Sequence, residues 1–270
     1  MSALRIGALI PVRLASERLP GKALKEICGK PVVCHLLDRV FASRFIADPK
    51  DAVVCTTEEA GDAPLVKIVQ DYGASVFRGD TDDIIKRFRD AIETFRFDAV
   101  IQVDGDDILC DPLYMDLTMD RLLTNAPLDV VSCRGLPLGI ASKSFTRRAM
   151  DKVFAHYRSS RNDTGFAYFF TRSGLCRQAV IDPVTPEHVL DEARLTLDYQ
   201  VDLEVFTRIF EAVYREGEVF GLADVTRFLR DTPEVMEINA NLDEEYWART
   251  REKADLEFVD SGGVTRSIEV

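Results

Sequence analysis

The segment RIGALIPVRLASERLPGK, residues 5–22, decides which fold class the sequence predicts. Residues 5–12 form a short apolar run that is typical of a buried strand. Residues 13–22 form a polar loop, and residues 30–43 then carry apolar side chains at helical spacing. A buried strand, a loop and a helix in this order are typical of the start of an α/β fold.

The same alternation continues along the chain. Further strands and helices are predicted in turn, with strands at 51–57, 74–79 and 98–107 and helices at 63–73, 82–95 and 111–124. Residues 129–145 read as strand, loop and strand, and residues 146–160 read as a helix. This pattern predicts a three-layer, Rossmann-like α/β fold, in which helices cover both faces of a mostly parallel sheet.

The last part of the chain is less regular. The aromatic run 165–170 is predicted as a core strand, with one wall of a substrate pocket as the alternative. A short strand, a helix with one apolar stripe and a further helix are then expected at residues 193–198, 201–214 and 221–239. The charged tail from Leu242 is expected to be ordered in part or to contact a partner. Because no linker-like segment interrupts the chain, we expect one domain over residues 1–270.

The composition limits the classes of protein that fit the sequence. The 270 residues are 46% hydrophobic, but no apolar run approaches the ~20 residues of a membrane span. The first residues do not have the pattern of a signal peptide, so a cytoplasmic location is expected. A formal net charge of −12 argues against non-specific nucleic-acid binding, which needs a basic face.

The loop that follows the first strand is basic within this acidic chain, and its residues suit an anion. Arg13, Arg18 and Lys22 provide two guanidinium groups and an ammonium, and Gly21 allows close approach to the backbone. The loop is not a Walker A motif, since Ser16 stands where that motif needs glycine, and no G-x-G-x-x-G is present. A solvated basic loop without a ligand is the alternative.

Acidic residues gather at the end of the strand predicted at residues 98–107, in the sequence VDGDD. Asp104, Asp106 and Asp107 come first, and Asp111 comes four residues later. Clustered carboxylates repel one another, so they usually have a cation or solvent between them. Carboxylate oxygens suit Mg²⁺ or Mn²⁺ bridged to substrate phosphates. The alternative is an exposed acidic turn in which Asp111 caps the next helix.

Asp198 ends the short strand predicted at residues 193–198. It either joins the acidic site or caps the following helix, and Asp202 lies one turn later. Ligands of open parallel sheets bind at the carboxyl ends of the strands. The basic loop, the acidic cluster and Asp198 all follow predicted strands, so we expect them at one edge of one sheet. The three histidines lie in no recognisable nucleophile motif.

Four segments, taken together, resemble a known family. PVRLASERLPGK, VFRGDTDDIIKRF, VDGDD…DP and LTLDYQVDLEVFTRIFEAVY occur in the order found in bacterial sugar-activating cytidylyltransferases. The sequence is most similar to the spore-coat polysaccharide type, and the CMP-Kdo and acylneuraminate synthetases are more distant relatives. The resemblance covers roughly residues 5–241. Its R-x-x-S-x-R-L-P-G-K pattern, from Arg13 to Lys22, is highly specific.

The resemblance implies a nucleotide-diphospho-sugar transferase-like fold and the chemistry of that family. CMP would pass from CTP to an anionic acceptor, by default a sugar acid, with release of pyrophosphate. The resemblance implies that Arg13, Lys22 and Asp106 act in catalysis, and that Asp106 and Asp198 hold Mg²⁺, with Mn²⁺ as the alternative. The nucleotide contacts that it implies are Arg13, Ser16, Arg18, Lys22, Thr56, Thr57, Arg78 and Asp104.

The resemblance also implies how the chain is divided. The nucleotide half would span about residues 1–125, and the acceptor half about residues 126–241. Relatives are often dimers, and the tail 242–270 is available for a homodimer contact.

The sequence departs from the family pattern in the half that would hold the acceptor. From Gly139 it reads GIASKSF in place of an acidic pair, and residues 164–170 read TGFAYFF in place of an acid–histidine pair. A third departure lies outside this half, since proline is usual just after the metal-binding acid and Asp107-Ile108 stands here. The acceptor therefore stays open, with a phosphonate as the alternative to a sugar acid.

Two other functions also stay open. The first is a metal-dependent glycosyltransferase of the GT-A type, which would use Asp104-Gly105-Asp106 as its D-x-D motif. The basic loop argues against it, because a glycosyltransferase handles a diphosphate and does not need this arrangement. The second is a non-catalytic relative that binds a nucleotide or a sugar.

Overall fold

The computed structural model describes residues 4–124, 127–159 and 161–270. The strands are β1 (Ile6–Pro11), β2 (Glu26–Ile27), β3 (Lys30–Pro31), β4 (Ala52–Thr57), β5 (Ser75–Gly79), β6 (Ala99–Gln102), β7 (Val130–Cys133), β8 (Lys143–Thr146), β9 (Gln178–Ile181), β10 (Glu257–Val259) and β11 (Thr265–Ser267). The helices are α1 (Val32–Phe41), α2 (Ala63–Asp71), α3 (Ile84–Phe95), α4 (Pro112–Thr124), α5 (Arg147–His156), α6 (Tyr168–Thr171), α7 (Gln200–Val213), α8 (Leu222–Asp231), α9 (Glu234–Glu237) and α10 (Leu242–Lys253).

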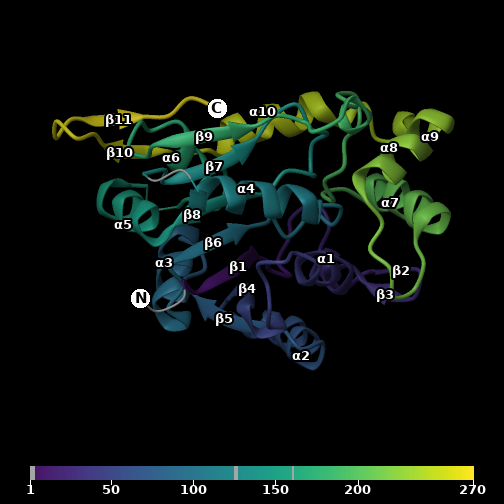
Figure 1. Ribbon diagram of the computed structural model, residues 1–270, viewed down its shortest axis with the longest axis horizontal. Helices are drawn as coiled ribbons and strands as arrows, with labels where there is room; N and C mark the ends of the chain where they lie inside the picture. Colours follow the sequence, from purple (N-terminus) through teal and green to yellow (C-terminus); the bar gives the residue numbers. More distant parts are fainter. Residues whose placement is uncertain (1–3, 125–126, 160) are drawn as a thin grey trace.

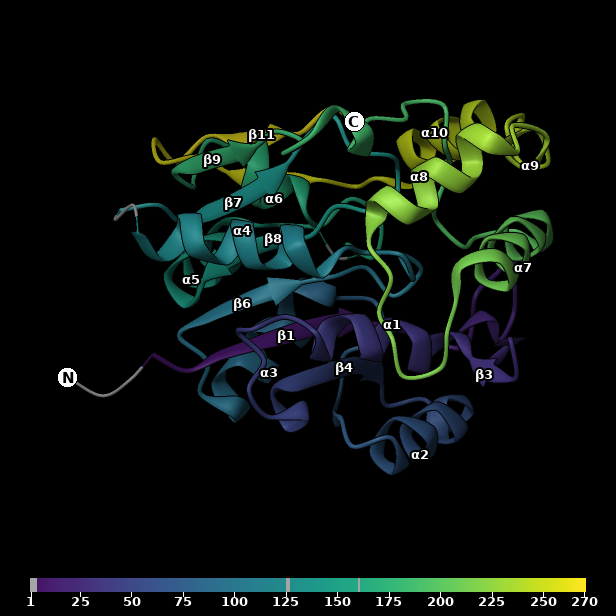
Figure 2. The same ribbon diagram turned by 45° about the vertical axis from the view of Figure 1, so that its right-hand side comes forward.

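Seven strands form one central sheet, in the order β5-β4-β1-β6-β8-β7-β9 (Figure 1). Only β8 departs from the common direction among these strands, since it runs antiparallel to both β6 and β7. Figure 2 shows the helices on either side of this sheet. The α/β class and the mostly parallel sheet that the sequence predicts are therefore confirmed.

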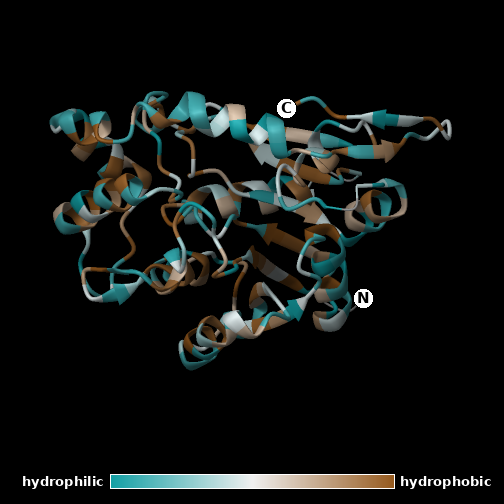
Figure 3. Cartoon of the chain, turned by 180° about the vertical axis from the view of Figure 1, so that it is seen from behind, coloured by the Kyte–Doolittle hydropathy of each residue, from teal (hydrophilic) through white to brown (hydrophobic). Residues whose placement is uncertain are grey.

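Each face of the sheet packs against its own hydrophobic core. In β1, Ala8 and Ile10 contribute to the core that α1, α2, α4, α7 and α8 complete. Leu9, between them, contributes to the core that α3, α5 and α6 complete. Successive side chains of a strand point to opposite faces, which explains this alternation. Figure 3 shows the central strands as mostly hydrophobic, as expected for strands covered on both faces.

The order of the strands changes direction at β1. On one side of it lie β4 and β5, and on the other side lies β6. Because β1 is parallel to both β4 and β6, the loops after these three strands leave from the same edge of the sheet. This edge therefore brings the basic loop, after Pro11, next to the acidic cluster, after Gln102.

The strand predicted at residues 193–198 is wrong. Only Arg194 pairs there, in an isolated bridge with Leu138. The segment crosses the carboxyl edge of the sheet, where Leu197 N donates to Asp106 O at 2.9 Å and Leu195 N to Leu138 O at 2.8 Å. Its apolar side chains are buried by this crossing and not by a strand ladder.

Two other predicted elements differ from the structure. Residues 165–170 form a turn and the start of α6 and not a core strand, with Phe169 and Phe170 buried. The helix predicted at 221–239 is two helices, because α8 ends at Asp231 and Pro233 then begins α9 as its N-cap. Proline has no backbone N–H to donate, so it favours such a break.

The tail from Leu242 is described throughout and forms α10 and the β10–β11 hairpin. In the described ranges, no helix has the combination of length and hydropathy that crossing a bilayer needs. Strands of the central sheet come from both predicted halves of the chain. The single domain and its division into halves stay predictions.

Candidate active site

A pocket of about 500 Å³ opens at the carboxyl edge of the sheet, beside β1 and β6. The basic loop and residues 104–107 line one part of it. Segments 136–143 and 163–168, Asp198 and α10 also contribute lining residues. Open α/β sheets bind ligands at such a point, where the strand order changes direction.

Buried Asp62 fixes the start of the basic loop. Its carboxylate accepts hydrogen bonds from Leu14 N at 2.8 Å, from Thr56 Oγ1 at 2.7 Å and from Thr57 Oγ1 at 2.6 Å. Burial alone raises the pKa of Asp62, but these donors outweigh burial and lower it. The carboxylate is therefore ionised, and it anchors the loop to the end of β4.

Gly105 allows the acidic segment to approach the basic loop. A Cβ atom at this position would lie 2.4 Å from Pro11 O, which is closer than atoms can pack. Any side chain here would push residues 104–107 away from the end of β1. The spacing of the two loops therefore depends on this glycine.

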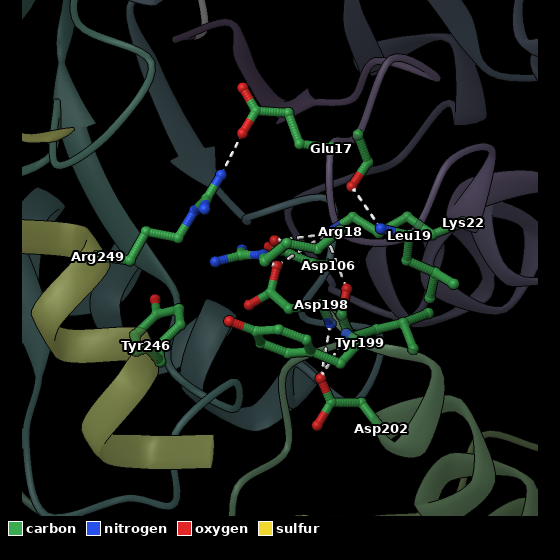
Figure 4. A network of polar contacts seen from close by, with 12 residues as sticks. Glu17, Arg18, Leu19, Lys22, Asp106, Asp198, Tyr199, Asp202, Tyr246 and Arg249 are labelled. Carbon is green, nitrogen blue, oxygen red and sulfur yellow. Dashed lines mark hydrogen bonds and ion pairs between the residues drawn. The ribbon is translucent and has the colours of Figure 1, made fainter.

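Lys22 joins the basic loop to two carboxylates. It begins a short 3₁₀ turn (Lys22–Leu24), and its ammonium donates to Asp106 Oδ2 at 2.9 Å and to Asp198 Oδ1 at 3.1 Å. A third hydrogen bond, of 2.7 Å, goes to Leu197 O. Figure 4 shows these side chains pointing toward one another from separate segments. The crossing segment carries Asp198 into this contact.

Asp198 is buried and faces two more cations. Arg18 donates to its Oδ1, and Arg194 Nη2 donates to its Oδ2 at 3.2 Å. Asp202 accepts from Asp198 N and Tyr199 N at 2.9 and 2.8 Å, and it thereby caps α7. Asp202 and not Asp198 is the capping residue, so the Asp198 carboxylate is available to the pocket.

Asp111 caps a helix, which was the alternative to a place in the acidic site. Its Oδ1 accepts from Leu113 N at 2.8 Å at the start of α4, and its Oδ2 accepts from Leu222 N at the start of α8, at 2.6 Å. It is buried and does not line the pocket.

The charges of the cluster shift the pKa values of its members. Burial lowers the pKa of Lys22, but Asp106 and Asp198 outweigh burial and raise it above the ordinary lysine value. Burial raises the pKa of Asp198, but Lys22 and Arg18 outweigh burial and lower it. The pKa of Asp106 is raised, because burial and repulsion from Asp198 and Asp104 exceed the attraction of Lys22. Burial is the largest cause of this shift, and the neighbouring carboxylates add to it.

The remaining predicted residues of the basic loop also reach the pocket. Arg13 Nη2 donates to Asp163 Oδ2 at 2.7 Å, and Ser16 Oγ accepts from Leu19 N at 3.3 Å within the loop. Asp104 accepts from Gln102 Nε2 at 2.8 Å, and Lys143 Nζ lies 3.7 Å from its other oxygen.

The other three predicted nucleotide contacts lie elsewhere. Thr56, Thr57 and Arg78 are not among the described residues that line the pocket. The two threonine hydroxyls donate to Asp62, and Arg78 donates to Thr57 O and Glu59 O at 2.9 and 2.8 Å. These donors hold the end of β4, and direct contact of the three residues with a nucleotide stays a prediction.

Sequence reasoning missed several residues that line the pocket or contact its lining residues. Lys143 belongs to one of the two segments that depart from the family pattern, and only that departure drew attention to it. Asp163 lies just before the other such segment, and no signal marked it. Arg194 is fully buried between Asp198 and Asp202, and no motif marked it. Tyr246 lies in the tail, whose composition gave no sign of a pocket wall.

The donors around Lys22 suit a hard cation. In the described parts of the chain, no group of three or more His, Cys, Asp or Glu side chains is arranged to hold a metal ion. Asp106 and Asp198 nevertheless share one cation already, since both accept from the Lys22 ammonium. Two carboxylates that share one cation have the oxygen donors that suit Mg²⁺, which takes its other ligands from water and substrate phosphates.

Comparison with known sequences identifies relatives. A family model described as cytidylyltransferase matches residues 7–169, which include the basic loop and the acidic cluster. A 3-deoxy-manno-octulosonate cytidylyltransferase of Yersinia pseudotuberculosis serotype O:1b (strain IP 31758) is 30% identical over 171 residues, which are 62% of this chain and 62% of that enzyme. The match therefore spans less than two thirds of the curated enzyme. An uncharacterized protein of Methanocaldococcus jannaschii is 25% identical over 254 residues, 92% of this chain and 100% of that one.

Solved structures with the same fold include cytidylyltransferases. One from Leptospira borgpetersenii serovar Hardjo-bovis (strain JB197) superposes with a TM-score of 0.78 at 25% identity, over 87% of this chain and 97% of that one. A CMP:2-keto-3-deoxy-manno-octonic acid synthetase complexed with CTP gives a TM-score of 0.59 at 15% identity, over 77% and 98% of the two chains. The second likeness shows the fold alone. Because the family model matches more than half of the residues, the chain belongs to the cytidylyltransferase family.

Proposed function

We propose that this protein transfers CMP from CTP to an anionic acceptor, a sugar acid, and releases pyrophosphate. The observation that carries the proposal is the meeting of Lys22 with Asp106 and Asp198 at the carboxyl edge of the sheet. Arg13 and Arg18 line the same pocket, so three cations of one loop face one cavity. A triphosphate is the anion that such a cluster suits.

The reaction needs little covalent chemistry from the protein. An acceptor oxygen forms a bond to the α-phosphorus, and the bond from this phosphorus to the pyrophosphate oxygen breaks. Arg13, Arg18 and Lys22 stabilise the negative charge that builds on the departing pyrophosphate. Asp104, whose carboxylate also lines the pocket, is the group that we assign to take the proton of an acceptor hydroxyl. Positioning and charge neutralisation therefore account for catalysis.

Asp106 and Asp198 would hold Mg²⁺, with Mn²⁺ as the alternative. When bound, the ion neutralises phosphate charge and polarises the phosphoryl oxygens. The two carboxylates have hard oxygen donors, and in the ligand-free protein their shared positive neighbour is the Lys22 ammonium. Lys22 is then free to move its ammonium toward the phosphates while its former partners keep a cation between them.

The names of the relatives and the charge of the pocket support the proposed acceptor class. The Yersinia relative is named for 3-deoxy-manno-octulosonate, a sugar acid. Lys143 stands in the segment where the family pattern has acids, and its presence in the pocket favours an anionic acceptor. A phosphonate is an anion like a sugar acid, and it is the second class of acceptor to test.

Pyrophosphate release tests the proposed function. Purified protein with Mg²⁺ is offered CTP, ATP, GTP or UTP, each with a panel of sugar acids and phosphonates. We expect pyrophosphate from CTP with a sugar acid. Consumption of a nucleotide sugar with CTP untouched would identify a glycosyltransferase. Stabilisation by CTP and Mg²⁺ without turnover on any acceptor would identify a binding protein.

Two further expectations belong to this proposal. A cytoplasmic location agrees with a substrate pool of CTP, and fractionation of cells checks it. A homodimer is expected from the resemblance, and light scattering of the purified protein at several concentrations measures the mass in solution.

A further inference from the structure

We propose that helix α10 recognises the acceptor, and that Arg249 and Lys253 bind an anionic group of the acceptor molecule. The inference rests on the proposed CMP transfer. It names the end of the pocket that the acceptor occupies, and it assigns binding residues outside residues 7–169, the part that the family model matches.

The two cations lie on one face of α10, four residues apart, and both line the pocket. Both donate to the same carboxylate, Glu17 of the basic loop, with Lys253 Nζ at 2.7 Å from Glu17 Oε2. Their side chains are 33% and 40% exposed, and that of Glu17 is 57% exposed. Two cations thus share one accessible carboxylate, which leaves one positive charge in excess.

Contacts with the buried Arg194 and with Tyr199 hold α10 in place. Arg194, fully buried, lies with Nη1 3.5 Å from Asp243 Oδ1 and with its guanidinium carbon 4.6 Å from the centre of the Tyr246 ring. Tyr199, at the start of α7, donates to Glu245 at 3.1 Å. The helix therefore presents its basic face in a fixed position, which lowers the entropic cost of binding a ligand.

The place of α10 favours the acceptor over the nucleotide. In Figures 1 and 2, α10 lies toward β7 and β9, away from β4 and β5 at the other end of the sheet. The basic loop, to which the proposed function assigns the triphosphate, follows β1, and β1 lies next to β4 in the sheet. Arg13, Arg18 and Lys22 already serve the triphosphate, and α10 adds Tyr246 and Trp247, whose rings can pack against a carbon skeleton.

Glu17 acts as a stand-in for the acceptor in the ligand-free protein. Figure 4 shows Arg249 extended from α10 toward the Glu17 carboxylate. An acceptor carboxylate or phosphonate would replace this exposed carboxylate and make hydrogen bonds of the same charge-assisted kind. Exchange of one exposed anion for another is inexpensive, because the surface ion pair itself contributes little stability.

The first test separates acceptor binding from nucleotide binding. The variant with Arg249→Met and Lys253→Met keeps the apolar stems and removes both charges, and Arg251→Met removes one charge from an exposed position of the same helix. We expect the double variant to raise KM for the acceptor at least about tenfold, with kcat and KM for CTP changed less than about twofold. An unchanged KM for the acceptor, or a rise in KM for CTP in its place, would overturn the proposal. The same effect from Arg251→Met would also overturn it.

The second test removes a negative charge in place of the positive charges of α10. Glu17→Gln removes the anion that competes with the acceptor, so KM for the acceptor should fall. A rise in this KM, as in the double variant, would show that Glu17 is needed to hold α10 and would contradict the proposal.

The third test does not depend on turnover. Trp247 is the single tryptophan of the chain and lines the pocket, so its fluorescence reports on ligands beside α10. The probes are 3-deoxy-manno-octulosonate for a carboxylate, 2-hydroxyethylphosphonate for a phosphonate and mannose as the neutral control. We expect a saturable change with an anionic probe, none with mannose, and at least about tenfold weaker binding in the double variant.

Each result of this titration decides the inference independently of the proposed function. Equal binding by the wild type and the double variant, or no response to either anion, overturns it. Binding that depends on α10, in a protein that releases no pyrophosphate from CTP, supports the α10 site and rejects the CMP transfer.

Discussion

Lys22 is the residue on which the site depends most. Its ammonium joins the basic loop, the acidic segment after β6 and the crossing segment that carries Asp198. Since Asp198 also has Arg18 and Arg194 as partners, the loss of Lys22 does not leave this buried carboxylate without a cation. A change at Lys22 should therefore affect ligand binding more than folding.

Replacing Lys22 with methionine should weaken CTP binding by about 1.5–3 kcal/mol, the scale of a hydrogen bond to a charged group. Titration calorimetry with CTP and Mg²⁺ measures this difference. Lys67→Met is the matched control, because Lys67 lies on α2 with a side chain that is 75% exposed. Equal CTP affinity in Lys22→Met and the wild type would make the loop ordinary surface.

Asp106 should show an opposite effect on activity and stability. Asp106→Asn should lower turnover by a factor on the order of 10² or more, the scale found when one electrostatic group of a site is lost. Burial and neighbouring carboxylates raise the pKa of Asp106, so its charge is unfavourable in the folded state at neutral pH. The thermal midpoint should therefore stay the same or rise.

Rate measurements and a thermal melt on the same preparation check both parts of this prediction. Asp71→Asn, at a side chain on α2 that is 65% exposed, is the control. Wild-type turnover in Asp106→Asn would remove the proposed metal site, and a large fall in midpoint would show that Asp106 is structural.

At the scale of the elements, Asp129 fastens the start of β7 to α5. Its fully buried carboxylate accepts from Arg148 Nε at 2.8 Å, from Lys152 Nζ at 2.7 Å and from Arg177 N at 3.0 Å. Burial raises the pKa of Asp129, but Lys152, the Arg177 amide and Arg148 outweigh burial and lower it. The ionised carboxylate therefore contributes to stability.

Asp129→Ala should lower the free energy of unfolding by about 1.5–3 kcal/mol at pH 7, because charge-assisted hydrogen bonds are lost. A group with a lowered folded-state pKa contributes fully above its unfolded value and loses its contribution as the pH falls through the folded value. Urea unfolding at pH 7 and below pH 3.8 should thus show a difference from the wild type that shrinks in acid. A constant difference would contradict the charge-based account, and Asp182→Ala, at an exposed ion pair, is the control.

Elements were predicted well where burial and periodicity agree. The apolar runs of β1, β4 and β6 read correctly because each strand is covered on both faces. Residues 193–198 were misread because a crossing segment can also bury alternate side chains, here Leu195 and Leu197. The alternation of apolar side chains along the sequence indicates which side chains are buried. It does not indicate whether the backbone pairs with a strand.

At the scale of the whole molecule, Arg194 connects the site to the tail. Its guanidinium lies between Asp198 and Asp202 and reaches Asp243 at the start of α10. Arg194→Met would leave Asp202, fully buried, without its cation, which typically costs about 3–5 kcal/mol. Urea unfolding measures the loss. Arg208→Met is the control, because that side chain is 56% exposed, and it should change the free energy of unfolding little. A loss of less than about 1 kcal/mol in Arg194→Met, the value of a surface ion pair, would contradict the proposed role of Arg194.

Long-range contacts set the limit of what the sequence could predict about the site. The basic loop and the acidic cluster were found because each follows a strand and carries its own chemical pattern. Arg249 contacts Glu17 across 232 residues of sequence, and no local pattern of α10 indicates that contact. Thr56 and Thr57 show a separate, local limit, because their hydroxyls donate to Asp62, only 6 and 5 residues away, and Asp62 carried no motif.

Transfer of label from CTP tests the central claim most directly. The protein is incubated with Mg²⁺, a sugar acid and CTP labelled at the α-phosphorus, and the products are separated. The account predicts label in a CMP–acceptor conjugate, unlabelled pyrophosphate in equal amount, and the loss of both in Asp106→Asn. Label that stays in CTP with every sugar acid and phosphonate offered would contradict it.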